Sequence, residues 1–119
     1  MNADDVLDML GQEPDVSEAH VLCRELKLFL DVGDDLFPPS IRVKIYKAVL
    51  SGSEVYEFQV SHHVHTPVQA APYYPSGTIQ RTEKEAILRA ISTTTSFIKS
   101  AIAAGHARSD RWLIPNTDF

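Results

Sequence analysis

The sequence contains a single cysteine, Cys23, so an internal disulfide bond is impossible. No stretch approaches the ~18 consecutive apolar residues that a membrane-spanning helix requires. The acidic start, MNADDVLDML, has no basic region of the kind that opens a signal peptide. These absences lead us to expect a cytoplasmic protein with no membrane partner.

Signature motifs of common enzyme classes are missing too. The chain has no G-x-G-x-x-G motif, no Walker A loop and no nucleophile elbow. Glu54 and Glu57 have opposite parity on a predicted strand, so their carboxylates would lie on different faces. We therefore name no catalytic residue and favour a non-enzymatic protein over an enzyme.

Basic residues are scarce in the first third of the chain. Residues 1–40 hold ten acidic and two basic side chains, a net charge of −8, whereas residues 41–119 hold six acidic and nine basic ones, a net charge of +3. This distribution argues against a uniformly basic nucleic-acid-binding surface.

The length of 119 residues, with 44% hydrophobic and 23% charged residues, suits one domain with one core. We predict a single α+β domain over residues 1–119. Residues 1–14 form an N-terminal segment that can fray, and residues 106–119 form a C-terminal tail that docks.

The longest helical pattern runs from Thr82 to Gly105. Thr82 and Glu85 have the spacing of a capping box, and Gly105 is a typical stop. Apolar residues then recur at three- and four-residue spacing, which predicts a helix over residues 83–104 with one buried face. The stripe consists of Ile87, Ala90, Ile91, Ile98, Ala101 and Ile102, flanked by Leu88 and Phe97.

Two further helices are predicted near the N-terminus. Residues 4–10 suit a short helix that ends at Gly11. Residues 16–32 carry Ala19, Leu22, Leu26 and other apolar side chains at helical spacing, which predicts a second amphipathic helix.

Residues 41–65 change to a period of two. Ile41, Val43 and Ile45 alternate with polar side chains, and the pattern resumes over residues 55–65 after a Ser-Gly-Ser turn. We predict an antiparallel hairpin of residues 41–50 and 55–65. Residues 66–80 have room for an extra short strand near 68–71 or 78–80, and the helices at 16–32 and 83–104 should cover one sheet face.

The predicted order of helix, strands and helix resembles that of double-stranded-RNA-binding domains. In that family the last helix begins with a lysine-rich cluster, whereas residues 81–85 read RTEKE, whose charges nearly cancel. The resemblance implies RNA binding as an alternative to protein binding. Six basic residues would serve a nucleic-acid partner: Arg42, Lys44, Lys47, Arg81, Arg108 and Arg111.

Histidines cluster at His62, His63 and His65. On one strand face His63 and His65 would lie about 7 Å apart, a separation that suits two ligands of one metal ion. His20 and Cys23, three residues apart on the predicted helix, could complete a tetrahedral set. Zinc is therefore the alternative to a protein without a cofactor.

A protein partner has three candidate surfaces. The outer face of the long helix carries small, uncharged residues that permit close approach of a second helix. Tyr73 and Tyr74 stand in an irregular loop, and Trp112 lies in an apolar stretch near the C-terminus. The residues concerned are Tyr73, Tyr74, Thr93, Ser96, Ser100 and Trp112. Our first hypothesis is a regulatory interaction protein that forms a homodimer.

Overall fold

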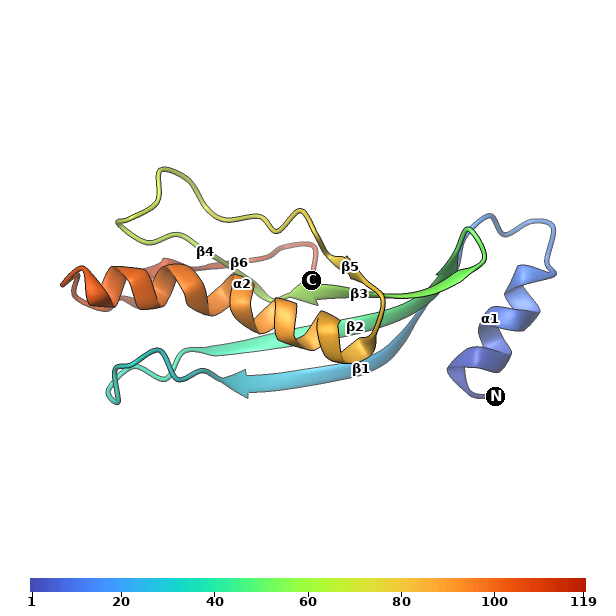
Figure 1. Ribbon diagram of the computed structural model, residues 1–119, viewed down its shortest axis with the longest axis horizontal. Coiled ribbons are helices and arrows are strands. Elements are labelled where there is room, and N and C mark those ends of the chain that lie inside the picture. Colours follow the sequence, from blue (N-terminus) through green and yellow to red (C-terminus); the bar gives the residue numbers. More distant parts are fainter.

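The computed structural model describes all 119 residues and contains two α-helices, a four-stranded antiparallel sheet and a two-stranded sheet (Figure 1). This confirms the predicted α+β class. In chain order the elements are α1 (Ala3–Gly11), β1 (His20–Phe29), β2 (Ser40–Leu50), β3 (Ser53–Val60), β4 (His62–Val64), β5 (Ile79–Gln80), α2 (Glu83–Ala103), a 3₁₀ turn (Asp110–Trp112) and β6 (Leu113–Pro115).

The main sheet has the strand order β1-β2-β3-β5, and each neighbouring pair is antiparallel. A two-residue turn joins β2 to β3, with φ of 51° at Ser51 and 79° at Gly52. Positive φ at both positions is typical of the type I′ turn, whose twist matches that of the strands. The predicted hairpin is therefore present, and the short β5 confirms the expected extra strand.

Helix α2 packs lengthwise against one face of this sheet. Thr82 caps its first turn by accepting a hydrogen bond from the Glu85 N–H at 3.1 Å. Between helix and sheet lies the core, in which small side chains on α2 meet larger ones on the strands. The core residues from these elements are Ile41, Val43, Ile45, Phe58, Val60, Ala86, Ala90, Ile98 and Ala101.

The predicted helix over residues 16–32 is wrong, because this segment contains the ten-residue strand β1. A β-bulge between Leu22 and Arg24 shifts the alternation of side chains within the strand. Beyond the bulge, Leu26 and Leu28 alternate with charged residues, which is the period of two expected of a strand. Because the alternation changes phase at the bulge, the segment as a whole does not show this period. Strand β1 pairs with β2 from His20 to Phe29, and the hydrogen bonds of this pairing stabilise the strand over a helix.

The predicted strand over residues 55–65 is interrupted at Ser61. The Ser61 N–H donates to the Arg42 carbonyl at 2.9 Å, and its hydroxyl accepts from the Arg42 N–H at 2.8 Å. These two bonds end the pairing with β2 and turn the chain, so that β4 pairs with β6 in a separate sheet. His62 therefore does not join Phe58 and Val60 in the core; it is half-buried.

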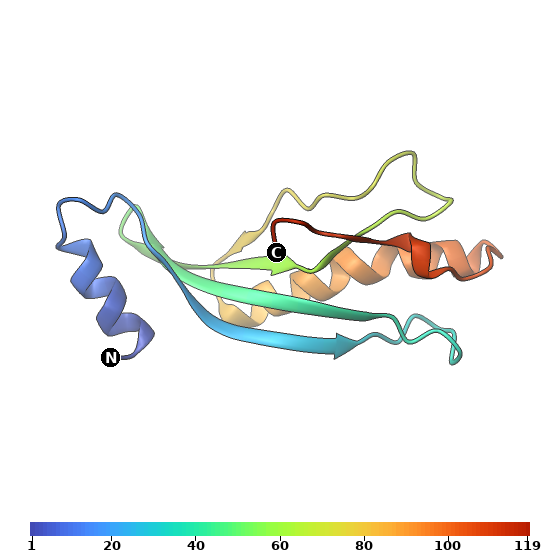
Figure 2. The same ribbon diagram turned by 180° about the vertical axis from the view of Figure 1, so that it is seen from behind.

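The protein is elongated, with extents of 54 × 26 × 22 Å. Its radius of gyration is 16.7 Å, against roughly 13.5 Å for a compact chain of this length. The start of β1, the end of β2 and the start of β3 project past α2 and form an arm (Figures 1 and 2). Helix α1 packs on this arm. Neither helix is long and apolar enough to cross a bilayer.

The C-terminal residues join the core through Trp112, which is 5% exposed. Its ring meets Phe37 edge-on, with ring centroids 6.2 Å apart. Asn116 continues the attachment, because its side-chain amide donates to the Val60 carbonyl at 2.9 Å. Trp112 thus ties the chain end to the loop between β1 and β2.

Replacing Trp112 with alanine should lower the free energy of unfolding by about 3–5 kcal/mol, because it removes a buried ring and leaves a cavity. Urea denaturation measures this change. Leu36→Ala, at a side chain that is 76% exposed, should shift it by less than about 0.5 kcal/mol. Equal, small losses in the two variants would contradict the docking of Trp112.

Candidate interaction surface

Strand β1 forms an open border of the main sheet, because only β2 pairs with it (Figure 1). The direction of its backbone groups follows from two observations. The Leu30 N–H donates to the carbonyl of Pro39, next to the start of β2, so the N–H of Leu30 faces β2. Arg42 of β2 lies opposite Lys27, and its N–H and C=O both bond Ser61 on the far side of β2, so they form no bond with Lys27. By strand alternation, Glu25, Lys27 and Phe29 point their backbone groups away from β2.

An apolar groove of about 420 Å³ runs between this border and α2. Leu26 of β1 lies on one side, and Ile87 and Leu88 of α2 lie on the other. Leu88 is 55% exposed and contributes accessible apolar surface to the groove. An ion pair between Arg24 and Glu83 joins the two walls.

The charges along the border are only partly paired. Glu25 forms an ion pair with Arg42 of β2. Lys27 lies directly opposite Arg42, a like charge, and has no carboxylate within ion-pairing distance. Its ammonium group instead lies 5.4 Å from the ring centre of Phe29, a side chain that is 68% exposed. The border therefore retains one positive charge for an external partner.

Two of the predicted partner residues, Trp112 and Thr93, are buried within the chain. Trp112 belongs to the core, as described above. Thr93 is 6% exposed, because the small side chains of α2 bring the helix close to its own sheet and loops rather than to a second helix. Burial is tolerated because the Thr93 hydroxyl donates to the Ala90 carbonyl at 3.0 Å.

The remaining predicted partner residues lie in the loop before β5 and on α2. Tyr73 is half-buried, with its ring centre 5.3 Å from that of Phe97, and it lines a small cavity with Thr93 and Ser96. Tyr74 is 64% exposed, and its ring centre lies 4.6 Å from that of His63 with the two ring planes tilted by 57°. Ser96 and Ser100 are exposed, although their hydroxyls donate back to helix carbonyls.

The four predicted zinc ligands do not come together: no group of three or more His, Cys, Asp and Glu side chains could hold a metal ion. His20 pairs with Glu18 at 3.1 Å. Cys23 donates to the Ile45 carbonyl at 3.3 Å, and burial, followed by the nearby Glu83, raises the pKa of its thiol. His63 and His65 lie in and just after β4, in the smaller sheet. Zinc binding stays a prediction from the sequence.

The six predicted nucleic-acid contacts are divided among different parts of the molecule. Lys44 and Arg42 flank the ring of Phe119 on the outer sheet face, at 4.1 and 5.6 Å. Lys47 is 9% exposed and pairs with Asp4 of α1, a hydrogen bond that raises its pKa. Arg108 pairs with Asp34 at 3.0 Å. Arg81 and Arg111 are exposed, and neither forms an ion pair within the chain.

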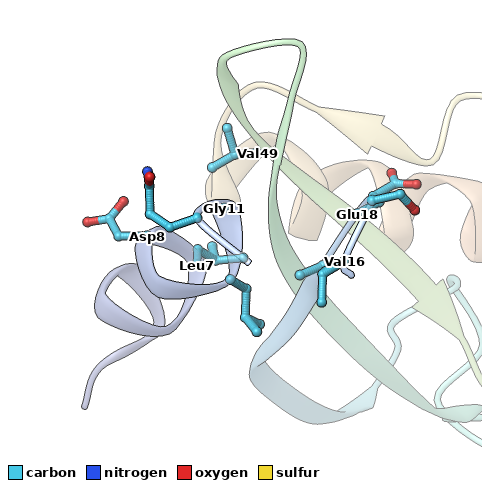
Figure 3. Close-up of a pocket in the computed structure, with 10 residues that line it drawn as sticks. Leu7, Asp8, Gly11, Val16, Glu18 and Val49 are labelled. Atoms are coloured by element: carbon cyan, nitrogen blue, oxygen red, sulfur yellow. The ribbon is translucent and has the colours of Figure 1, made fainter. Parts of the chain in front are cut away.

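A hollow of about 240 Å³ separates α1 from the arm (Figure 3). Leu7, Val16 and Val49 lie around it, and polar residues such as Asp8 and Glu18 share its rim. Leu7 is the one buried residue of α1. The hollow marks where the N-terminal helix attaches to the arm.

Comparison with protein families, with curated proteins and with solved structures gave no match for this chain. Among the features described, the border of β1 and its groove combine unpaired backbone groups with accessible apolar surface, so they are the candidate interaction surface. The sequence interpretation missed them because it placed residues 16–32 in a helix. The alternation of Leu26 and Leu28 with charged neighbours was the signal that could have revealed them.

The free energy of unfolding should fall as the pH drops below about 6.5, the ordinary histidine pKa. Burial lowers the pKa of His62 in the folded protein, and the charge of His63 adds to this effect. Stability from the neutral imidazole is therefore present above the unfolded pKa and is lost as pH falls through the folded one.

Urea denaturation at pH 7.5 and 5.5 measures this dependence. His62→Asn should flatten it, whereas His106→Asn, at an exposed site, should leave it unchanged. Equal pH dependence of the wild type and His62→Asn would contradict the assignment to His62.

Proposed function

We propose that this protein is a non-catalytic, cytoplasmic interaction protein that regulates by protein–protein contact and self-associates as a homodimer. The observation that carries the proposal is the open border of β1 beside an apolar groove. The border supplies backbone hydrogen-bonding groups and the groove supplies apolar surface. Together these are the two components of strand addition to a sheet.

An open strand is a template for another strand, and proteins usually block it with charged side chains, prolines, bulges or very short length. Here β1 is ten residues long and contains no proline. Its one bulge lies between Leu22 and Arg24, near the arm. The stretch from Arg24 to Phe29 carries three charged side chains but no proline, and it pairs with β2 without a break, which supports its use for pairing.

The groove supports the same proposal through its apolar content. Leu26, Ile87 and Leu88 form the apolar part of a groove that a neighbouring chain could fill, and the charged residues Arg24, Glu83 and Lys84 line the rest. Complete burial of one leucine side chain stabilises a complex by about 1.5–3 kcal/mol. In a symmetric dimer each residue contributes twice, so the half-exposed Leu88 has a large effect on association.

Leu88→Glu should weaken self-association at least tenfold, because it places a charge in apolar surface that association would bury. Sedimentation equilibrium and light scattering over a range of micromolar concentrations measure the dissociation constant. Ala103→Glu, an exposed site at the far end of α2, is the matched control and should leave it unchanged. A wild-type protein that stays monomeric at high micromolar concentration would contradict self-association.

A further inference from the structure

We infer that the partner surface for β1 is the same strand of a second copy, antiparallel to the first, with Leu26 of each copy directly opposite Leu26 of the other. The inference rests on the proposed self-association and adds its geometry. Such a dimer joins the two four-stranded sheets into one continuous sheet across a twofold axis.

The backbone restricts the possible registers. Glu25, Lys27 and Phe29 point their N–H and C=O groups outward, so they must form the hydrogen-bonded pairs of a new ladder. Odd-numbered residues therefore face odd-numbered residues of the partner. Every register that places an odd-numbered residue opposite an even-numbered one leaves these groups without partners.

The bulge restricts the registers further. The regular stretch spans only Arg24 to Phe29, because the strand is irregular between Leu22 and Arg24. The twofold axis must lie near the middle of this stretch if the copies are to share several pairs. Three centres remain: Glu25, Leu26 and Lys27.

Charge decides among the three. A centre at Glu25 places two carboxylates opposite each other, and a centre at Lys27 places two ammonium groups opposite each other, both unfavourable. A centre at Leu26 places Glu25 opposite the partner's Lys27, and Lys27 opposite the partner's Glu25. Lys27, which has Arg42 rather than a carboxylate beside it within the chain, then gains an opposite charge.

The same register fits the groove. Leu26 is in a non-hydrogen-bonded position toward the partner, where opposing side chains approach most closely. It lies on the sheet face that α2 covers, in the groove lined by Ile87 and Leu88. The two grooves thus meet at the axis, and the two Leu26 side chains fill the space between them.

Charge reversal tests the pairing. Lys27→Glu places a carboxylate opposite Arg42 within the chain, so it should keep the monomer folded. Across the dimer axis it places this carboxylate opposite the partner's Glu25, and the unfavourable pair occurs twice in the symmetric dimer. We expect dissociation constants roughly tenfold higher for Lys27→Glu alone and for Glu25→Lys alone. An equimolar mixture of the two variants should associate again, because each mixed dimer pairs opposite charges twice.

Disulfide trapping tests the register. In a Cys23→Ser background, Leu26→Cys should form a covalent dimer in a glutathione redox buffer, since paired Cα atoms about 4.5 Å apart suit a disulfide. Leu28→Cys is the matched control on the same strand face. In the inferred register, position 28 of one copy lies four residues along the strand from position 28 of the other. This distance of about 13 Å is too long for a disulfide bond.

The outcomes separate the two proposals. Trapping by Leu26→Cys but not Leu28→Cys, together with rescue in the mixture, supports the inferred dimer. A wild type that dimerises without trapping at position 26, or without rescue by mixing, overturns the register while self-association stands. A wild type that remains monomeric at high micromolar concentration, with no trapping of either variant, overturns both.

Discussion

Backbone hydrogen bonding between strands determines how the main sheet is assembled and which of its borders stays open. Strand β2 has neighbours along both of its borders, and Ser61 supplies a side-chain hydroxyl where the ladder with β3 ends. Strand β1 has a neighbour on one border only. Water can satisfy the outer backbone groups of β1, but a strand of a second copy would satisfy them while also covering the groove beside α2.

Most of the buried side chains of α2 are small, which suits a helix that packs closely on the sheet and on neighbouring segments. Ala86, Ala90 and Ala101 are fully buried and allow the helix axis to approach the strands closely. Three consecutive threonines, Thr93 to Thr95, are also buried, and each hydroxyl donates to a helix carbonyl. Small and weakly polar residues on a helix can therefore indicate a buried face as well as an exposed one. The exposed Leu88, near the helix start, is the exception that adjoins the open strand.

The sequence predicted α2, the hairpin and the α+β class, because their periodicity and turn residues are determined locally. It failed at β1, because the bulge near Cys23 shifts the alternation of apolar and polar side chains. The apolar residues on the two sides of the bulge then have the spacing of a helix. The sequence predicted that the C-terminal tail docks, but it did not indicate which residues lie beside Trp112 and Thr93, since Phe37 and Tyr73 are far along the chain from them. The candidate surface was missed because residues 16–32 were placed in a helix. The alternation of Leu26 and Leu28 with charged neighbours indicates a strand, but the position of that strand at the sheet border depends on the sheet order.

Residue-resolved amide hydrogen exchange of the unmodified protein, followed by NMR at increasing concentration, tests the pairing of β1 most directly. In the monomer the N–H groups of Leu26 and Leu28 face β2 and should exchange slowly, while those of Glu25 and Lys27 face water and should exchange rapidly. Pairing with a second copy predicts that Glu25 and Lys27 become protected as the concentration rises. Rapid exchange of both amides at every concentration would contradict the pairing.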